Sequence, residues 1–191
     1  KNIIKSINKN KIKHFIFSST AAVYKSSNNK LTEKSKLDPS NIYGKTKLDC
    51  EKEIIKNLNL SNKTNYIIFR FFNVCSSLIS KKIGEIHNPE THLIPILAYK
   101  FKKNKKIFIY GDNFKTKDKT CIRDYIHIND ILTAFEKGMS YLELKKKSQI
   151  INLGTKKGFS TLSIFNMFIK FYNYKFKKPF YKDRRKGDVD K

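Results

Sequence analysis

The stretch that decides the fold runs from His14-Phe-Ile-Phe-Ser18 to Tyr66-Ile-Ile-Phe-Arg-Phe-Phe72. Both of these runs are short and apolar, as in a buried strand, and small polar residues close the first one. Between them, Asp38-Pro-Ser-Asn41 has the residue types that start a helix, and apolar residues continue at helical spacing to about Asn57. A strand, a helix and a second strand in this order predict a parallel crossover unit and therefore an α/β sheet.

Further elements are expected on both sides of this unit. Isoleucines at helical spacing in residues 1–11 predict the tail of a helix, whereas the stretches 25–35 and 75–89 predict loops. Beyond residue 90, the sequence predicts helices at 93–101, 129–144 and 161–172, strands at 106–110 and 149–153, a short segment at 125–128 and a basic, polar end. No internal repeat or Gly/Ser linker divides this second region from the first.

Composition limits the class of protein. The 191 residues, 39% of them hydrophobic, can bury a sizeable core, and no stretch approaches the roughly 18 apolar residues of a membrane span. A signal-peptide pattern is absent, and three cysteines without CxxC spacing predict reduced thiols and a cytoplasmic location.

The net charge of +25 first suggests nucleic-acid binding, because lysines release counterions from phosphate backbones. The lysines are scattered over nearly every segment, however, and only four of the 41 basic residues are arginine, which reads bases in DNA grooves. Asparagine and isoleucine are also abundant. We therefore expect a genome-wide codon bias and no specific nucleic-acid partner.

The candidate for chemistry is Tyr43, which begins Tyr43-Gly-Lys-Thr-Lys47. A spacing of four places its phenol and the Lys47 ammonium on one helical face, where the cation stabilises the phenolate of a general base. The pattern alone is weak, because it also begins at Tyr99, Tyr141 and Tyr174. Only Tyr43 follows a strand that ends in Ser18-Ser-Thr20, and hydroxyls at the carboxyl end of a parallel strand face the ligand crevice.

Motifs along nearly the whole chain resemble those of a known family. The extended short-chain dehydrogenases/reductases carry segments similar to Ser18-Ser-Thr-Ala-Ala-Val-Tyr24, Tyr43-Gly-Lys-Thr-Lys47 and Arg70-Phe-Phe-Asn73. Within that family, the UDP-glucose 4-epimerases carry segments similar to His87-Asn-Pro-Glu-Thr-His-Leu-Ile-Pro95 and Thr120-Cys-Ile-Arg-Asp-Tyr-Ile-His127. The match continues through Asn152-Leu-Gly154 and Arg184-Arg-Lys-Gly-Asp188.

This resemblance implies NAD-dependent interconversion of UDP-glucose and UDP-galactose through a 4-keto intermediate, as in galactose metabolism, by a homodimer without a membrane partner. Tyr43 would take the proton from the sugar's 4-hydroxyl, Thr20 would hydrogen-bond the same oxygen, and Lys47 would bind the nicotinamide ribose. The implied NAD contacts are Ser18, Tyr43, Lys47 and Phe72.

The four arginines are informative because this chain uses lysine almost everywhere else. A guanidinium grips phosphate with a planar fork, so Arg123 and Arg185 are the candidates for the substrate diphosphate. Arg70 is interpreted as a structural ion pair at a strand end, and Arg184 is left open. The resemblance adds these substrate contacts: Thr20, Asn73, His92 and Leu93 in the pocket, Tyr110 near the uracil and Asp188 on the ribose.

Metal binding is not expected. His14, His87 and His127 show no metal-ligand spacing with cysteines or carboxylates.

Departures from the family pattern indicate which part of such an enzyme this sequence contains. No glycine-rich loop for the NAD pyrophosphate occurs in the 191 residues, so we expect a fragment that lacks the first dinucleotide-binding unit and is inactive alone. Residues 1–73 would be the distal half of a doubly wound, Rossmann-type domain. Residues 74–191 would be a smaller α/β region that binds the UDP-sugar, with segments near 121–172 returning to the first domain.

Smaller departures concern single residues. Lys25 and Lys119 stand at usual glycine positions, and Ser76 with Ser77 replaces a usual Gly-Ala pair. A β-carbon where the backbone needs positive φ costs about 1 kcal/mol or more.

Four alternatives remain open at this point. A sugar-nucleotide dehydratase on the same fold needs an acid and a base beside Thr20, but Ala21 and Ala22 follow it. A 4-epimerase for pentoses or N-acetylated sugars, a catalytically incompetent remnant and a basic nucleic-acid-binding module are the other three.

Overall fold

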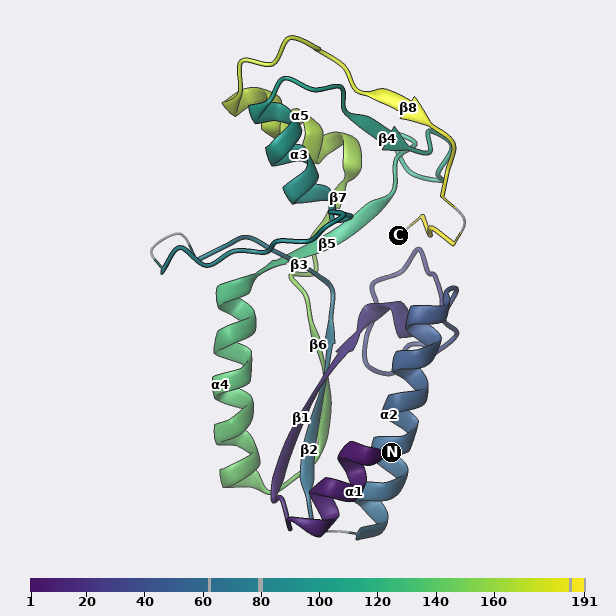
Figure 1. Cartoon of the computed structure of the whole chain (residues 1–191). Helices are drawn as coiled ribbons and strands as arrows, with labels where there is room; N and C mark the ends of the chain where they lie inside the picture. The colour runs from purple at the N-terminus through teal and green to yellow at the C-terminus, as the bar shows by residue number, and fades with distance from the viewer. Residues whose placement is uncertain (62, 79–80, 186, 191) are drawn as a thin grey trace.

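The computed structural model describes residues 1–61, 63–78, 81–185 and 187–190, which form an α/β fold (Figure 1). Three parallel strands build the first sheet: β1 (His14–Thr20), β2 (Asn65–Phe71) and β6 (Gln149–Leu153), with β2 in the middle. The helix α2 (Ile42–Ser61) connects β1 to β2. The predicted parallel crossover unit and the predicted α/β class are therefore confirmed.

Helices cover both faces of this sheet. Figure 1 shows α1 (Asn2–Lys9) and α2 on one face and α4 (Ile128–Lys145) on the other. The middle strand serves both faces because its side chains alternate: Tyr66 and Ile68 belong to the core under α1 and α2, whereas Ile67 and Phe69 belong to the core under α4.

A second apolar core lies away from this sheet, around α3 (Leu93–Lys102) and α5 (Thr161–Phe171). Aromatic rings fill it: the ring centroid of Phe101 lies 5.3 Å from that of Phe165 and 4.4 Å from that of Tyr174. Beside these helices, β4 (Phe108–Tyr110) pairs in parallel with β8 (Phe180–Lys182).

A third sheet joins the two regions. Its strands are β3 (Asn73–Cys75), β5 (Ile122–His127) and β7 (Gly158–Ser160); β5 lies in the middle, parallel to β3 and antiparallel to β7. β5 continues directly into α4, and β7 continues into α5 (Figure 1). This sheet therefore fixes the second region relative to the carboxyl ends of the first sheet.

The elements predicted beyond residue 90 also form, with different ends. Residues 125–128 are the end of β5 and the first residue of α4, and α2 extends to Ser61 where the sequence predicted an end near Asn57. The strands β3, β7 and β8 were not predicted, because alternation cannot be recognised in three residues. Among the described residues, no helix combines the length and the apolarity that a membrane crossing requires. The domain division at residue 73 stays a prediction.

Candidate active site

A cavity of about 570 Å³ opens at the carboxyl ends of β1 and β2. Its wall is formed by the end of β1, the start of α2, residues 71–78 and the segment that precedes α3. The carboxyl edge of a parallel α/β sheet is where ligands of such folds bind, and the volume suits a ligand of moderate size.

Tyr43 lines this cavity from the first turn of α2. The side-chain oxygen of Asn41 accepts a hydrogen bond from the Gly44 amide at 2.8 Å and so caps the helix within the stretch 38–41 where the sequence predicted a helix start. Gly44 is required here because a β-carbon would lie 2.2 Å from the Ala22 carbonyl oxygen. Close packing of α2 on the short 3₁₀ helix η1 (Ala21–Val23) therefore sets the position of Tyr43.

Thr20 and Lys47 lie beside this tyrosine. The Thr20 hydroxyl oxygen accepts from the Ala22 amide at 3.1 Å, which leaves its own proton free to donate into the cavity that Thr20 lines. The Lys47 ammonium donates to the Ser18 carbonyl oxygen at 2.9 Å and lies 5.9 Å from the centroid of the Tyr43 ring. The structure thus brings a hydroxyl, a phenol and an ammonium to one edge of the sheet.

The other tyrosines with a lysine four residues on have different surroundings. The Tyr99 hydroxyl accepts from Lys105 at 3.2 Å, the Tyr141 hydroxyl accepts from Gln149 at 3.1 Å, and Tyr174 is buried in the second core. None of these three lines the cavity. Of the four tyrosines, Tyr43 is thus the one that lines this cavity.

The remaining predicted residues divide into two groups. Phe72, Asn73 and His92 line the same cavity as Tyr43, and Asn73 also donates to the Asp124 carbonyl oxygen at 3.1 Å. Leu93 packs instead against the second apolar core. Ser18 takes part through its backbone carbonyl, which holds Lys47.

The second group lies outside the cavity lining. The Arg185 guanidinium sits 4.0 Å from the centroid of Tyr110, and the Arg123 guanidinium lies 3.9 Å from the Asp188 carboxylate and donates to the Val189 carbonyl at 2.9 Å. A β-carbon at Gly187 would lie 4.0 Å from the Ser40 carbonyl oxygen, so this segment runs close to the start of α2. Lys186, within the same motif, lies outside the described residues.

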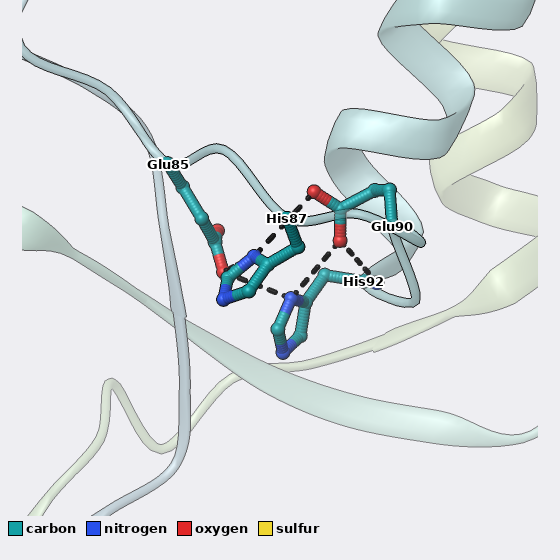
Figure 2. Close-up of side chains that lie close together, drawn as sticks. All are labelled: Glu85, His87, Glu90 and His92. Carbon is teal, nitrogen blue, oxygen red and sulfur yellow. Dashed lines mark hydrogen bonds and ion pairs between the residues drawn. The ribbon is translucent and has the colours of Figure 1, made fainter.

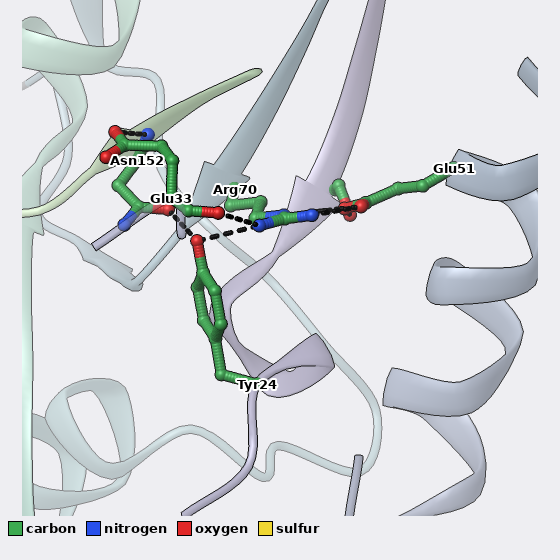
Figure 3. Close-up of polar contacts among 6 residues, drawn as sticks. Tyr24, Glu33, Glu51, Arg70 and Asn152 are labelled. Carbon is green, nitrogen blue, oxygen red and sulfur yellow. Dashed lines mark hydrogen bonds and ion pairs between the residues drawn. The ribbon is translucent and has the colours of Figure 1, made fainter. Parts of the chain in front are cut away.

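Figure 3 shows a buried polar network around Arg70, which is connected to the cavity lining through Ser19. The Arg70 guanidinium donates to Glu51 at 2.6 Å and to the Tyr24 hydroxyl at 2.8 Å, and Tyr24 donates to Asn152 at 2.6 Å. Ser19, which lines the cavity, also donates to Glu51. The interpretation of Arg70 as a structural ion pair is confirmed. Burial raises the pKa of the Tyr24 phenol, although Arg70 opposes this shift, so Tyr24 keeps its proton and serves as a donor.

Glu51 and Cys75 were missed by the sequence reasoning. Glu51 resembles any other acidic residue of a surface helix until the fold places Arg70 opposite it. Cys75 lines the cavity, and burial raises the pKa of its thiol, so the thiol stays protonated and is a poor nucleophile.

His87 has two carboxylate neighbours that the sequence reasoning did not identify: its Nδ1 lies 3.2 Å from Glu85 and 3.7 Å from Glu90. The signal was present in the sequence as alternating glutamates and histidines between residues 85 and 92.

The expected backbone strain is found at two of the departures. Ser76 has φ 87° and Lys119 has φ 60°, which is the region that favours glycine. Lys25 is not among the described residues with positive φ; its amide pairs with the Lys36 carbonyl at 2.8 Å. The strain predicted for Lys25 is therefore wrong.

Comparison with known proteins gives the following similarities. The profile of the "NAD dependent epimerase/dehydratase family" matches residues 1–154. A UDP-glucose 4-epimerase of Lactobacillus helveticus is 37% identical over 165 residues, which are 85% of this chain and 50% of that protein. The UDP-glucose 4-epimerase of Streptococcus mutans is 37% identical over 182 residues, covering 94% and 54%.

Solved structures give the same result. A crystal structure of a UDP-glucose 4-epimerase superimposes with a TM-score of 0.88 at 37% identity and covers 98% of this chain and 57% of that one. The Bifidobacterium longum UDP-glucose 4-epimerase in complex with NAD⁺ and UDP has a TM-score of 0.87 at 28% identity, covering 98% and 56%. The chain thus spans about half the length of the proteins it matches.

Proposed function

This chain belongs to the NAD dependent epimerase/dehydratase family, and from that premise we propose that it carries the catalytic tyrosine and the sugar-nucleotide site of a UDP-glucose 4-epimerase. The observation that carries the proposal is that Thr20 and Tyr43 line one and the same cavity, with Lys47 beside the Tyr43 ring. The similarity to UDP-glucose 4-epimerases along most of the chain supports the substrate class.

The residues at this edge of the sheet fit the nicotinamide end of NAD. Phe71, Phe72 and Val74 give the cavity an apolar wall, and Lys47 places a cation at its edge. When bound, NAD would accept a hydride from carbon 4 of the sugar and return it to the opposite face. Lys47 and Phe72 are the residues proposed to hold it.

Proton transfer falls to this chain's own side chains. The Tyr43 phenolate takes the proton from the sugar's 4-hydroxyl and returns it at the end of the reaction. The ammonium of Lys47 stabilises this phenolate electrostatically, and Thr20 donates its free proton to the same sugar oxygen. These roles rest on the position of the three groups around the cavity.

The nucleotide end of the substrate is assigned to the second group of residues. The Arg123 and Arg185 guanidiniums bind the diphosphate, and Asp188 accepts a hydrogen bond from the ribose. The Arg185 guanidinium covers one face of the Tyr110 ring, so the uracil would contact the part of the ring that Arg185 leaves open. Asn73 and His92, which line the cavity, contact the sugar.

The wider proposal concerns the whole enzyme. It interconverts UDP-glucose and UDP-galactose in galactose metabolism as a homodimer in the cytoplasm, and a related 4-epimerase of other sugar specificity is the second candidate. Three free cysteines support a reducing compartment. Within this enzyme, residues 1–73 are the proposed cofactor-binding region and residues 74–191 the proposed substrate-binding region.

The test adds to this chain the half of a related enzyme that the chain does not cover. We would join the 191 residues to the remaining half of the Lactobacillus helveticus relative and measure UDP-galactose conversion. Tyr43→Phe should lower turnover at least about 100-fold, because a general base contributes roughly that much, while UDP affinity stays unchanged. Tyr99→Phe, which has the same spacing to a lysine but lies outside the cavity, should keep full turnover.

The 191 residues alone serve as the second control. They should neither convert UDP-galactose nor co-purify with NAD, because no part of their sequence has the glycine spacing that holds the pyrophosphate. The assignment of Tyr43 is wrong if its phenylalanine variant turns over as fast as the parent.

A further inference from the structure

Four side chains converge on the segment that leads into α3 (Figure 2). Glu85, His87, Glu90 and His92 each offer one nitrogen or oxygen atom, and these four atoms all lie within 4.8 Å of one another. Both imidazole rings turn Nδ1 toward the same two carboxylates, with ring centroids 5.0 Å apart. Four potential metal ligands from a segment of eight residues thus lie within reach of one another.

The distances suit a small divalent cation. The His92 Nδ1 lies 2.8 Å from Glu85 and 3.1 Å from Glu90, and the His87 Nδ1 lies 3.2 Å and 3.7 Å from the same two carboxylates. Metal–ligand bonds of about 2.0–2.1 Å in a tetrahedron place ligand atoms about 3.3 Å apart. The four histidine–carboxylate distances lie within about 0.5 Å of this value, and the remaining pairs of donor atoms lie within 4.8 Å, so a central ion would draw the four side chains closer together.

The partners of the carboxylates are unusual for this chain. Although the chain has 37 lysines, the basic side chains within 4.0 Å of the Glu85 and Glu90 carboxylates, among the described residues, are these two histidines. Two carboxylates and two neutral imidazoles neutralise a divalent cation and combine the oxygen and nitrogen ligands that Zn²⁺ accepts. The Thr91 and His92 amides donate to Glu90 at 2.8 Å each and so orient one of the ligands.

From this convergence, the geometry points to a divalent-cation site of the Zn²⁺ type, held by Glu85, His87, Glu90 and His92. Glu85 and His92 also line the cavity that contains Tyr43, so a bound ion fixes one wall of that cavity and the orientation of His92. The role is structural: the ion cross-links residues 85–92 at the point where the chain enters α3.

The test is a Zn²⁺ titration of the 191-residue chain without a polyhistidine tag, in competition with a chromophoric chelator. One Zn²⁺ should bind per chain. His87→Gln and Glu90→Gln should each weaken binding at least about tenfold, since even loss of a group that only orients a ligand costs 10–100-fold. Neither variant touches the apolar cores, and circular dichroism during thermal unfolding verifies that each one folds.

Two controls separate this site from other ligands of the chain. His14→Gln removes a histidine at the opposite end of β1 and should leave Zn²⁺ affinity unchanged. Alkylation of the exposed Cys50 should also leave it unchanged, and bound Co²⁺ should show no sulfur-to-cobalt charge-transfer band, which excludes all three cysteines as ligands. Equal affinity in His87→Gln and the parent, loss of binding on alkylation, or no Zn²⁺ binding at all would each overturn the proposal.

Discussion

At the residue scale, Arg70 and Glu51 form a buried ion pair. The side chain of Arg70 is 2% exposed and that of Glu51 is 1% exposed, so both charges have lost their water. Such a buried pair is stable because its hydrogen-bonding groups have partners. Glu51 accepts hydrogen bonds from Arg70 and Ser19, and Arg70 also donates to the Tyr24 hydroxyl. Through Ser19, Arg70 and Asn152 the network connects β1, β2 and β6.

We predict that Arg70→Met destabilises the chain by about 3–5 kcal/mol, because Glu51 is left buried and unpaired. The double variant Arg70→Met/Glu51→Leu removes both charges and should recover most of this loss. Urea unfolding of Arg70→Met, Glu51→Leu and the double variant gives the free energy of unfolding of each, and hence the coupling energy between the two side chains. A single variant that loses less than about 1 kcal/mol, or a double variant that recovers nothing, contradicts this account.

Sequence reasoning reached the network only in part. Tyr24, Arg70 and Asn152 each fall in a separate motif, and arginine in a lysine-rich chain marked Arg70. The partner Glu51 could not be predicted, since it is 19 residues away in sequence and meets Arg70 only after α2 packs on β2. The Glu–His segment was missed for a different reason: its spacing matches no common zinc motif, although all four residues lie within one loop.

At the element scale, the start of α2 controls where Tyr43 lies. The sequence predicted a helix start within residues 38–41 but not the reason for Gly44, because contact with Ala22 is a tertiary feature. The three-residue strands are a similar case. β3 and β8 owe their extended form to pairing with β5 and β4 rather than to local propensity, so only the folded chain reveals them.

We predict that Gly44→Ala destabilises the chain by about 1–3 kcal/mol, despite the roughly 1 kcal/mol by which alanine favours a helix interior. The new β-carbon would lie 2.2 Å from the backbone oxygen of Ala22, so α2 or η1 must move. Gly84→Ala is the matched control, because a β-carbon there meets its nearest neighbour at an ordinary 3.5 Å. The measurement is the free energy of unfolding of both variants; equal values would show that the helix start is not tightly packed.

At the scale of the whole molecule, the high positive charge suggests nucleic-acid binding, whereas the positions of the arginines suggest a site for a sugar nucleotide. The net charge of +25 would attract any polyanion, including nucleic acid, so steep salt dependence of binding decides nothing. The positions of the basic side chains are more informative than their number. Arg123 and Arg185 belong to the second group of site residues, close to Asp188 and Tyr110, whereas the lysines are spread along the chain.

We predict that UDP-glucose protects Arg123 and Arg185 of the 191-residue chain from a guanidinium-specific reagent, whereas a mixed-sequence oligonucleotide does not. The diphosphate would occupy the forks of these two guanidiniums, while an oligonucleotide spreads its phosphates over 37 lysines without preference. Peptide mass spectrometry gives the rate of modification at each arginine. Arg70 reports on folding, because at 2% exposure it should stay unmodified under every condition until the chain unfolds. Protection by the oligonucleotide and not by UDP-glucose would support a nucleic-acid-binding module, since only a phosphate backbone would then be reaching these two side chains.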